Sequence, residues 1–148
     1  MYKSILLPTD GSKLSAKAVK QAVRFAKAIG AKITALHVMP EFQMIADEGY
    51  ALPSMMSLRK RFDEESAVRA QAILDEVRNE AANAAVECQC VSTVGSAPWE
   101  AIIKQAGKQK CDLIMMASHG RKGLQSLLLG SETTKVLVHS KIPVLVVR

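Results

Sequence analysis

Residues 4–12 read Ser-Ile-Leu-Leu-Pro-Thr-Asp-Gly-Ser, a short apolar run followed at once by a dense turn signal. The run Ser4–Leu7 predicts a buried strand, and Pro8 halts it. Residues 13–29 follow with an apolar stripe at helical spacing, and Gly30 is a natural C-terminal stop. The stripe consists of Leu14, Ala18, Ala22, Phe25, Ala26 and Ile29. The chain therefore begins with a strand–turn–helix unit.

The same alternation continues to the last residues. Further strands are predicted at 32–38, 87–94, 112–117 and 143–147. Helices are predicted at 56–84, from Pro98 onward, and at 132–139, whereas residues 41–55 have no period and form a connection. The 56–84 helix carries an apolar side that includes Leu58, Phe62 and Ile73. Such alternation predicts an α/β fold of one domain: an open, mostly parallel five-stranded sheet with helices on both faces.

Open sheets of this kind bind ligands beyond the carboxyl ends of their strands, where the strand order reverses. Two strand ends carry unusual residues, namely 8–12 and Ser118-His119-Gly120. Gly120 permits close backbone approach and a positive φ. Gly130-Ser131 precedes a helix whose first N–H groups attract anions, although the same pair is also an ordinary helix start. A phosphate-binding crevice and a simple cap both remain open from these residues alone, and neither a P-loop nor a GxGxxG fingerprint is present.

The composition limits the classes of partner that the protein is expected to bind. The net charge of +6 is concentrated in the first helix, where five bases form one stripe: Lys13, Lys17, Lys20, Arg24 and Lys27. We interpret the stripe as a solvated helix face, with a DNA or lipid surface as the alternative. Aromatic residues make up only 4% of the chain, which disfavours nucleic acid as a partner. No apolar run approaches the ~20 residues of a membrane span, and a cytoplasmic location is expected.

No catalytic or metal-binding constellation is apparent. Cys88, Cys90 and Cys111 lack neighbouring ligands and are predicted to be core thiols. Asp10 has no partner acid or base at a spacing that suggests catalysis, and is more consistent with a turn residue. His37 is predicted to be a satisfied interior residue, and His119 either packs in its loop or touches a phosphate. We therefore expect no catalytic residues and no metal site.

Seven blocks of the sequence match one family in order and spacing. They are residues 5–12, Leu36-His37-Val38, Gly95 with Pro98, Asp112-Leu113-Ile114, Ser118-His119-Gly120, Gly130-Ser131 and residues 143–147. On these blocks the sequence resembles the universal stress protein family from end to end. The resemblance implies an adenine nucleotide alpha hydrolase-like fold with strand order 3-2-1-4-5, usually dimeric. Many members bind ATP through Gly-x2-Gly-x9-Gly-Ser/Thr, and others lack the motif and bind no nucleotide.

The resemblance also implies which residues contact a nucleotide. The motif falls on Ala117, Gly120, Gly130 and Ser131, with Asp10 near the ribose and the backbone of Val38 at the adenine. The full expected set is Pro8, Thr9, Asp10, Val38, Met116, Ala117, Gly120, Gly130, Ser131, Glu132 and Thr133. Arg121 and Lys122 are available as counter-charges. Two departures stand out: Ala117 replaces the first glycine, and Glu132 puts a carboxylate in the first turn of the phosphate-binding helix.

The leading interpretation is a cytoplasmic stress-response protein that binds ATP, with or without Mg²⁺, and acts as a regulatory or signalling module. The alternative is a dimeric interaction module with a vestigial cleft. In either case the apolar final strand, Val144–Val147, is expected to be a sheet edge that pairs with a second copy in a homodimer.

Overall fold

The computed structural model describes residues 1–43, 53–120 and 128–148. Within them, strands and helices alternate as the sequence predicts. The elements are β1 (Ser4–Pro8), α1 (Lys13–Ile29), β2 (Lys32–Met39), α2 (Pro53–Asn83), β3 (Cys88–Val94), α3 (Pro98–Lys108), β4 (Leu113–Ala117), α4 (Ser131–His139) and β5 (Val144–Val147).

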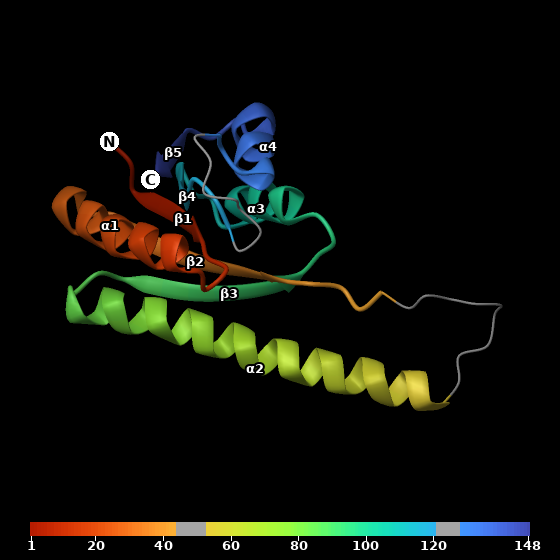
Figure 1. The fold of residues 1–148 in the computed structure, drawn as a ribbon. Helices are drawn as coiled ribbons and strands as arrows, with labels where there is room; N and C mark the ends of the chain where they lie inside the picture. The colour runs from red at the N-terminus through yellow and green to blue at the C-terminus, as the bar shows by residue number, and fades with distance from the viewer. Residues whose placement is uncertain (44–52, 121–127) are drawn as a thin grey trace.

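The strands form one parallel sheet in the order β3-β2-β1-β4-β5, which confirms the predicted topology. From β1 the chain builds outward to β2 and β3, then returns to the other side of β1 for β4 and β5. The strand order therefore reverses between β1 and β4. Helices α1 and α2 cover one face of the sheet, and α3 and α4 cover the other (Figure 1).

The central strands are buried on both faces, as parallel strands between two helical layers should be. Ile5 and Leu7 belong to the core under α1 and α2, whereas Leu6 belongs to the core under α3 and α4. Strand β4 divides in the same way: Met115 and Ala117 lie in the first core, and Met116 in the second. Alternation along β4 thus decides which helices each side chain contacts.

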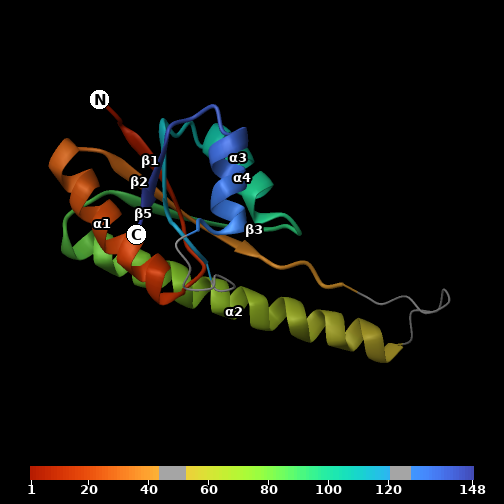
Figure 2. The ribbon, with the colours of Figure 1, turned by 45° about the horizontal axis from the view of Figure 1, so that its top comes forward.

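Helix α2 is longer than the sheet that it covers. Its buried residues, Ala70, Ile73, Leu74, Val77 and Ala81, all lie in the C-terminal half. The N-terminal half extends past the end of the sheet (Figures 1 and 2). Leu58, predicted on the buried side, is consequently 57% exposed, because no strand lies beneath it. Leu14, on the predicted apolar stripe of α1, is also exposed.

The element boundaries shift where local hydrogen bonding favours it. Helix α2 begins at Pro53 rather than residue 56, and proline suits a first helical turn. Asp112 precedes β4 instead of opening it, and its carboxylate accepts hydrogen bonds from the N–H groups of Lys3 and Ser4 at 2.8 and 2.9 Å. Partial burial would raise the pKa of Asp112, but these N–H groups outweigh it and hold the pKa below that of a free aspartate.

The cysteines pack without ligands in the described part of the chain. Cys111 is buried, whereas Cys88 and Cys90 lie half-buried on the edge strand β3. Burial, with the neighbouring Cys90 thiol, raises the pKa of Cys88 to about 11. No group of three potential metal ligands occurs within residues 1–43, 53–120 and 128–148. Over the same residues, no helix is both long and apolar enough to cross a bilayer.

Candidate functional site

The candidate site, which we call the crevice, is the region past the point where β1 and β4 stop pairing. Their register ends at Leu6 with Ile114, two residues before Pro8, which has no N–H to extend the ladder. The loops that follow come into contact: a Cβ on Gly120 would lie 2.6 Å from Asp10 Oδ2. A side chain at 120 would require the Asp10 carboxylate to move, and Gly120 is not among the described glycines with positive φ, which are Gly11 and Gly30.

The loop after β1 is held by hydrogen bonds of its own polar residues. The Asp10 Oδ1 atom accepts the Ser12 N–H at 2.9 Å, which forms a turn. Ser12 caps α1, its Oγ accepting the Ser15 N–H at 3.2 Å. These two bonds orient the Asp10 carboxylate, so that Oδ2 faces the loop of Gly120.

Two residues that sequence reasoning did not assign to the site hold Thr9. The Ser15 hydroxyl donates to Thr9 Oγ1 at 2.6 Å, and the His37 Nδ1–H donates to the Thr9 carbonyl at 2.9 Å. Both side chains are buried. His37 is thus the satisfied interior residue that was expected, and it also supports the loop. The only sequence signal for Ser15 is its position three residues after the capping Ser12.

The backbone of Val38 is exposed to the crevice by the same arrangement. Along β2, even-numbered residues bond toward β1: Lys32 N–H reaches Lys3, and Leu36 accepts from the Thr9 N–H at 2.8 Å. The next hydrogen bond of this ladder would join the Val38 N–H to the Thr9 carbonyl. That carbonyl instead accepts a hydrogen bond from the His37 ring. The N–H and carbonyl of Val38 therefore point toward the crevice, past the end of β1.

The N-terminus of helix α4 is hydrogen-bonded to the carboxyl end of β4. Its capping residue Gly130 donates its N–H to the Ser118 carbonyl at 2.9 Å. Thr133 Oγ1 donates to the Ala117 carbonyl at 3.0 Å, which ties the first turn to the strand. The first intrahelical bond runs from Thr134 N–H to the Gly130 carbonyl, so the N–H groups of residues 131–133 precede it. These three N–H groups and the helix dipole create a positive potential at the crevice.

His119 is used within its own loop. Its Nδ1 lies 3.0 Å from Ser118 Oγ, and its Nε2–H donates to the Leu128 carbonyl. Both ring nitrogens are therefore engaged by the residues that lead into and out of the 120–128 stretch. Of the two expectations for His119, this geometry favours packing in the loop.

Glu132 is directed away from the N-terminus of its own helix. Its Oε2 accepts the Trp99 N–H at 2.8 Å, in the first turn of α3. Helix α3 needs this partner because its own cap, Ala97, offers no side-chain acceptor. Oε1 lies 3.8 Å from Lys135 Nζ. The carboxylate of Glu132 is thus partly neutralised and serves α3, while its N–H remains in the first turn of α4.

Ala117 departs from the expected glycine without strain. It is not among the described residues with positive φ, and its side chain is 8% exposed. The methyl group belongs to the core under α1 and α2, whereas α4 lies over the opposite face. The extra carbon therefore points away from the α4 N-terminus.

The other expected site residues contribute in part. Pro8 ends β1 at the mouth of the crevice. The side chain of Met116 is buried in the core under α3 and α4, and its backbone pairs with Val146 of β5, so the structure does not bring it to the crevice. Arg121 and Lys122 lie outside the described residues.

The reversal between β1 and β4, with a helix N-terminus beside it, defines the class of protein: an open α/β protein with the adenine nucleotide alpha hydrolase-like fold. The particular family follows from sequence comparison. The model of the universal stress protein family matches residues 1–148, and the chain belongs to that family.

Relatives that match along the whole of this chain support the assignment. Universal stress protein MJ0531 of Methanocaldococcus jannaschii is 34% identical and covers 100% of this chain and 83% of its own. MJ0577 of the same organism is 32% identical, over 100% of this chain and 96% of its own. The MJ0577 crystal chain superposes with a TM-score of 0.83, over 99% of this chain and 96% of that one. A universal stress protein in complex with cAMP is 28% identical, with a TM-score of 0.72 over 99% and 97%.

Proposed function

We propose that the crevice between β1 and β4 binds an adenine nucleotide, ATP in particular, and that the protein is a regulatory nucleotide-binding module of the stress response. One observation carries the proposal. The first turn of α4 presents three N–H groups, while the Glu132 carboxylate, which would repel a phosphate there, bonds to the Trp99 N–H instead. The related protein in complex with cAMP supports an adenine nucleotide as the ligand class.

Each part of the nucleotide has a matching group. The N–H groups of Ser131, Glu132 and Thr133 suit the phosphates, and Gly130 keeps the approach clear. Asp10, oriented by Ser12, suits the ribose hydroxyls. The N–H and carbonyl of Val38 suit the donor–acceptor edge of adenine. Mg²⁺ would be bound by the phosphates of ATP and would enter the site together with the nucleotide.

Binding without catalysis is part of the proposal. The hydroxyls of Ser12 and Ser15 are used to cap α1 and to hold Thr9. Three of the four histidine ring nitrogens near the crevice also have partners: His37 Nδ1 donates to the Thr9 carbonyl, His119 Nδ1 lies 3.0 Å from Ser118 Oγ, and His119 Nε2–H donates to the Leu128 carbonyl. The crevice residues are therefore suited to holding a ligand in the cytoplasm and reporting its presence.

The direct test is to denature the protein purified from cells and to identify released small molecules by mass spectrometry. We expect adenine nucleotide in the supernatant of the wild type, and markedly less from Gly130→Asp prepared in parallel. If neither preparation releases nucleotide, and added ATP does not raise the melting temperature of the wild type, the cleft is vestigial.

Assembly through β5 is a second part of the proposal. The strand is an edge of the sheet, and Val144, Leu145 and Val146 are only half-buried. An apolar edge strand favours pairing with its copy in a symmetric homodimer. Val146→Lys should weaken this dimer in light scattering far more than Lys141→Glu, an exposed charge change outside the strand. A wild type that is monomeric at micromolar concentration contradicts the assignment.

A further inference from the structure

The outward face of the N-terminal half of α2 carries a pattern that nucleotide binding does not use. Two large apolar side chains there are strongly exposed, Leu58 at 57% and Val68 at 71%. Single exposed apolar residues are ordinary on any surface. These two, however, belong to one stripe, which we call the outer stripe. It consists of Ser54, Leu58, Arg61, Glu65, Val68 and Ala72.

The outer stripe has the spacing of a helix–helix contact. Its members follow one another at intervals of four and three residues in alternation, the repeat of a coiled-coil seam. All six are exposed, and they lie nearly opposite the buried residues Ala70, Ile73, Leu74 and Val77. The stripe is therefore free of the sheet, along a helix that extends beyond it (Figure 2).

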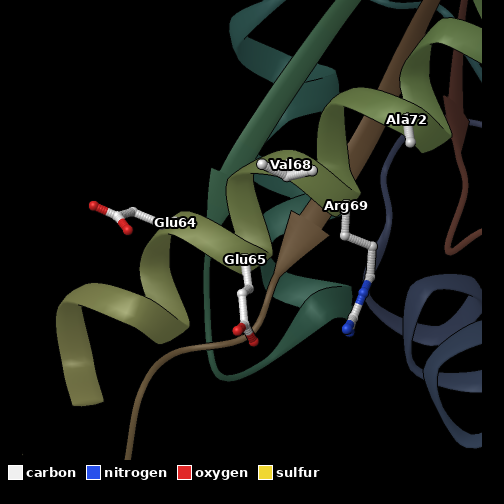
Figure 3. A pocket seen from close by; sticks show the side chains of 5 residues that line it. All are labelled: Glu64, Glu65, Val68, Arg69 and Ala72. Atoms are coloured by element: carbon white, nitrogen blue, oxygen red, sulfur yellow. The ribbon is translucent and has the colours of Figure 1, made fainter. Parts of the chain in front are cut away.

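A shallow hollow of about 450 Å³ lies on the same face, lined by Glu64, Glu65, Val68, Arg69 and Ala72. Figure 3 shows Val68 on the near side of the helix, with Glu65 and Arg69 extending together below it. An apolar side chain from a partner would contact Val68 there and leave the charged groups at the rim.

The charges on this part of the helix stand in two blocks of opposite sign. Residues 59–61 are all basic and residues 63–65 are all acidic. A base placed four residues before an acid forms a stabilising i,i+4 pair, although this order is weaker than the reverse one. Arg61 nevertheless pairs with Glu65 in that order, Nε to Oε1 at 3.0 Å, with both side chains exposed. The pairs Arg59–Asp63, Lys60–Glu64 and Arg61–Glu65 stabilise the helix only weakly, because all six side chains are exposed.

The arrangement is self-complementary when two copies run antiparallel. With a two-fold axis beside residue 63, Arg61 faces the second copy's acidic position 65, and Leu58 faces the apolar position 68. The small residues Ser54 and Ala72 meet at the ends, where they permit close approach. A parallel pairing would place like charges opposite each other. We propose that the outer stripe of α2 is a second self-association surface, at which two copies of this chain pair antiparallel.

This surface is small, since 19 residues of helix span only ~28 Å. Association through it alone belongs among weak, transient contacts. The outer stripe is separate from the β5 edge, because α2 packs on β2 and β3 and β5 is the opposite edge strand of the sheet. The two surfaces can therefore be tested independently, and the inference does not depend on nucleotide binding.

The experiment is sedimentation velocity over micromolar to millimolar protein, in the Val146→Lys background that removes pairing through β5. We expect reversible dimers whose dissociation constant rises about tenfold in Arg61→Glu and in Glu65→Arg, and returns toward the starting value when both changes are combined. The matched control is the exchange Arg59→Asp with Asp63→Arg, an exposed i,i+4 pair on the same helix but outside the stripe, which should change nothing.

Orientation is tested by oxidative cross-linking. A mixture of Leu58→Cys and Val68→Cys should give the mixed disulfide dimer in preference to either self-linked dimer, above the background from the native thiols. All four positions are exposed, so the variants should keep the wild-type circular dichroism spectrum. The proposal is overturned if the dissociation constants of both single charge variants equal that of the Val146→Lys parent, or if each cysteine variant links preferentially to itself.

Discussion

Replacing Ala117 by glycine restores the residue that the nucleotide motif of the family has at this position. If the methyl group obstructed the ligand, the change would improve binding. The structure predicts otherwise, because the side chain lies in the core under α1 and α2 and the backbone φ is not positive. The variant should lose stability and leave nucleotide affinity unchanged.

The loss can be worked from the burial of the methyl group. Ala117 is 8% exposed, so its removal forfeits most of the ~0.8 kcal/mol of a buried carbon. Glycine inside a strand costs a further ~0.5–1 kcal/mol in backbone entropy. The free energy of unfolding should therefore fall by about 1.5 kcal/mol, which lowers Tm by roughly 3–6 °C for a domain of this size.

Two measurements on the same preparations decide the question. Thermal unfolding of the apo proteins gives the stability change, and calorimetric titration with Mg·ATP gives the dissociation constants of wild type and Ala117→Gly. Within a factor of about two these constants should agree. A variant that binds ATP tenfold more tightly with unchanged Tm would show that the methyl group projects into the crevice, and would refute the assignment of Ala117 to the core.

Three further predictions follow from single groups. Glu132→Gln keeps an acceptor for the Trp99 N–H but removes the charge, so calorimetry should show ATP bound about two- to fivefold more tightly; equal or weaker binding contradicts the repulsion. The folded-state pKa of Asp112 lies below its unfolded value, so its contribution exists above about pH 3.8 and is lost as pH falls through the folded value. Urea unfolding should accordingly show Asp112→Asn to be less stable than wild type at neutral pH, with the gap closing in acid. Because the pKa of Cys88 is about 11, its labelling by a thiolate-selective reagent at pH 8 should be slower than that of a free cysteine, as followed by peptide mass spectrometry.

Most of the fold could be predicted from the alternation of apolar strands and amphipathic helices. The periodicity of α2 could not reveal how far along the helix the sheet packs against it. Leu58 and Ile73 both follow the apolar pattern, yet Ile73 is buried and Leu58 is exposed. The difference is set by the length of the strands beneath the helix, and a helix's own sequence does not record it.

The positions of the loops that form the candidate site could be predicted from the sequence, but the contacts of their side chains could not. Turn residues and glycines locate the loops of Asp10, Gly120 and Gly130, because their constraints are local. The direction of the Glu132 carboxylate depends on the start of α3, more than thirty residues away in sequence, where Trp99 offers an uncapped N–H. The role of His37 likewise depends on the register of β1 against β2. Such contacts require the tertiary arrangement.

The central claim, that the α4 N-terminus binds the phosphates of an adenine nucleotide, is tested most directly by titrating Mg·ATP into wild type, Gly130→Asp and Gly130→Ser in a calorimeter. A Cβ at this position meets Ser118 O at 3.1 Å and His119 Cα at 3.3 Å, a crowding that both substitutions share. Both residues are good caps at the observed φ of −60° and ψ of 152°, so both variants should fold. The account predicts binding heat in wild type, retained at reduced affinity in Gly130→Ser and abolished in Gly130→Asp, whose carboxylate occupies the anion position. No heat in wild type, or equal heat in wild type and Gly130→Asp, would contradict it.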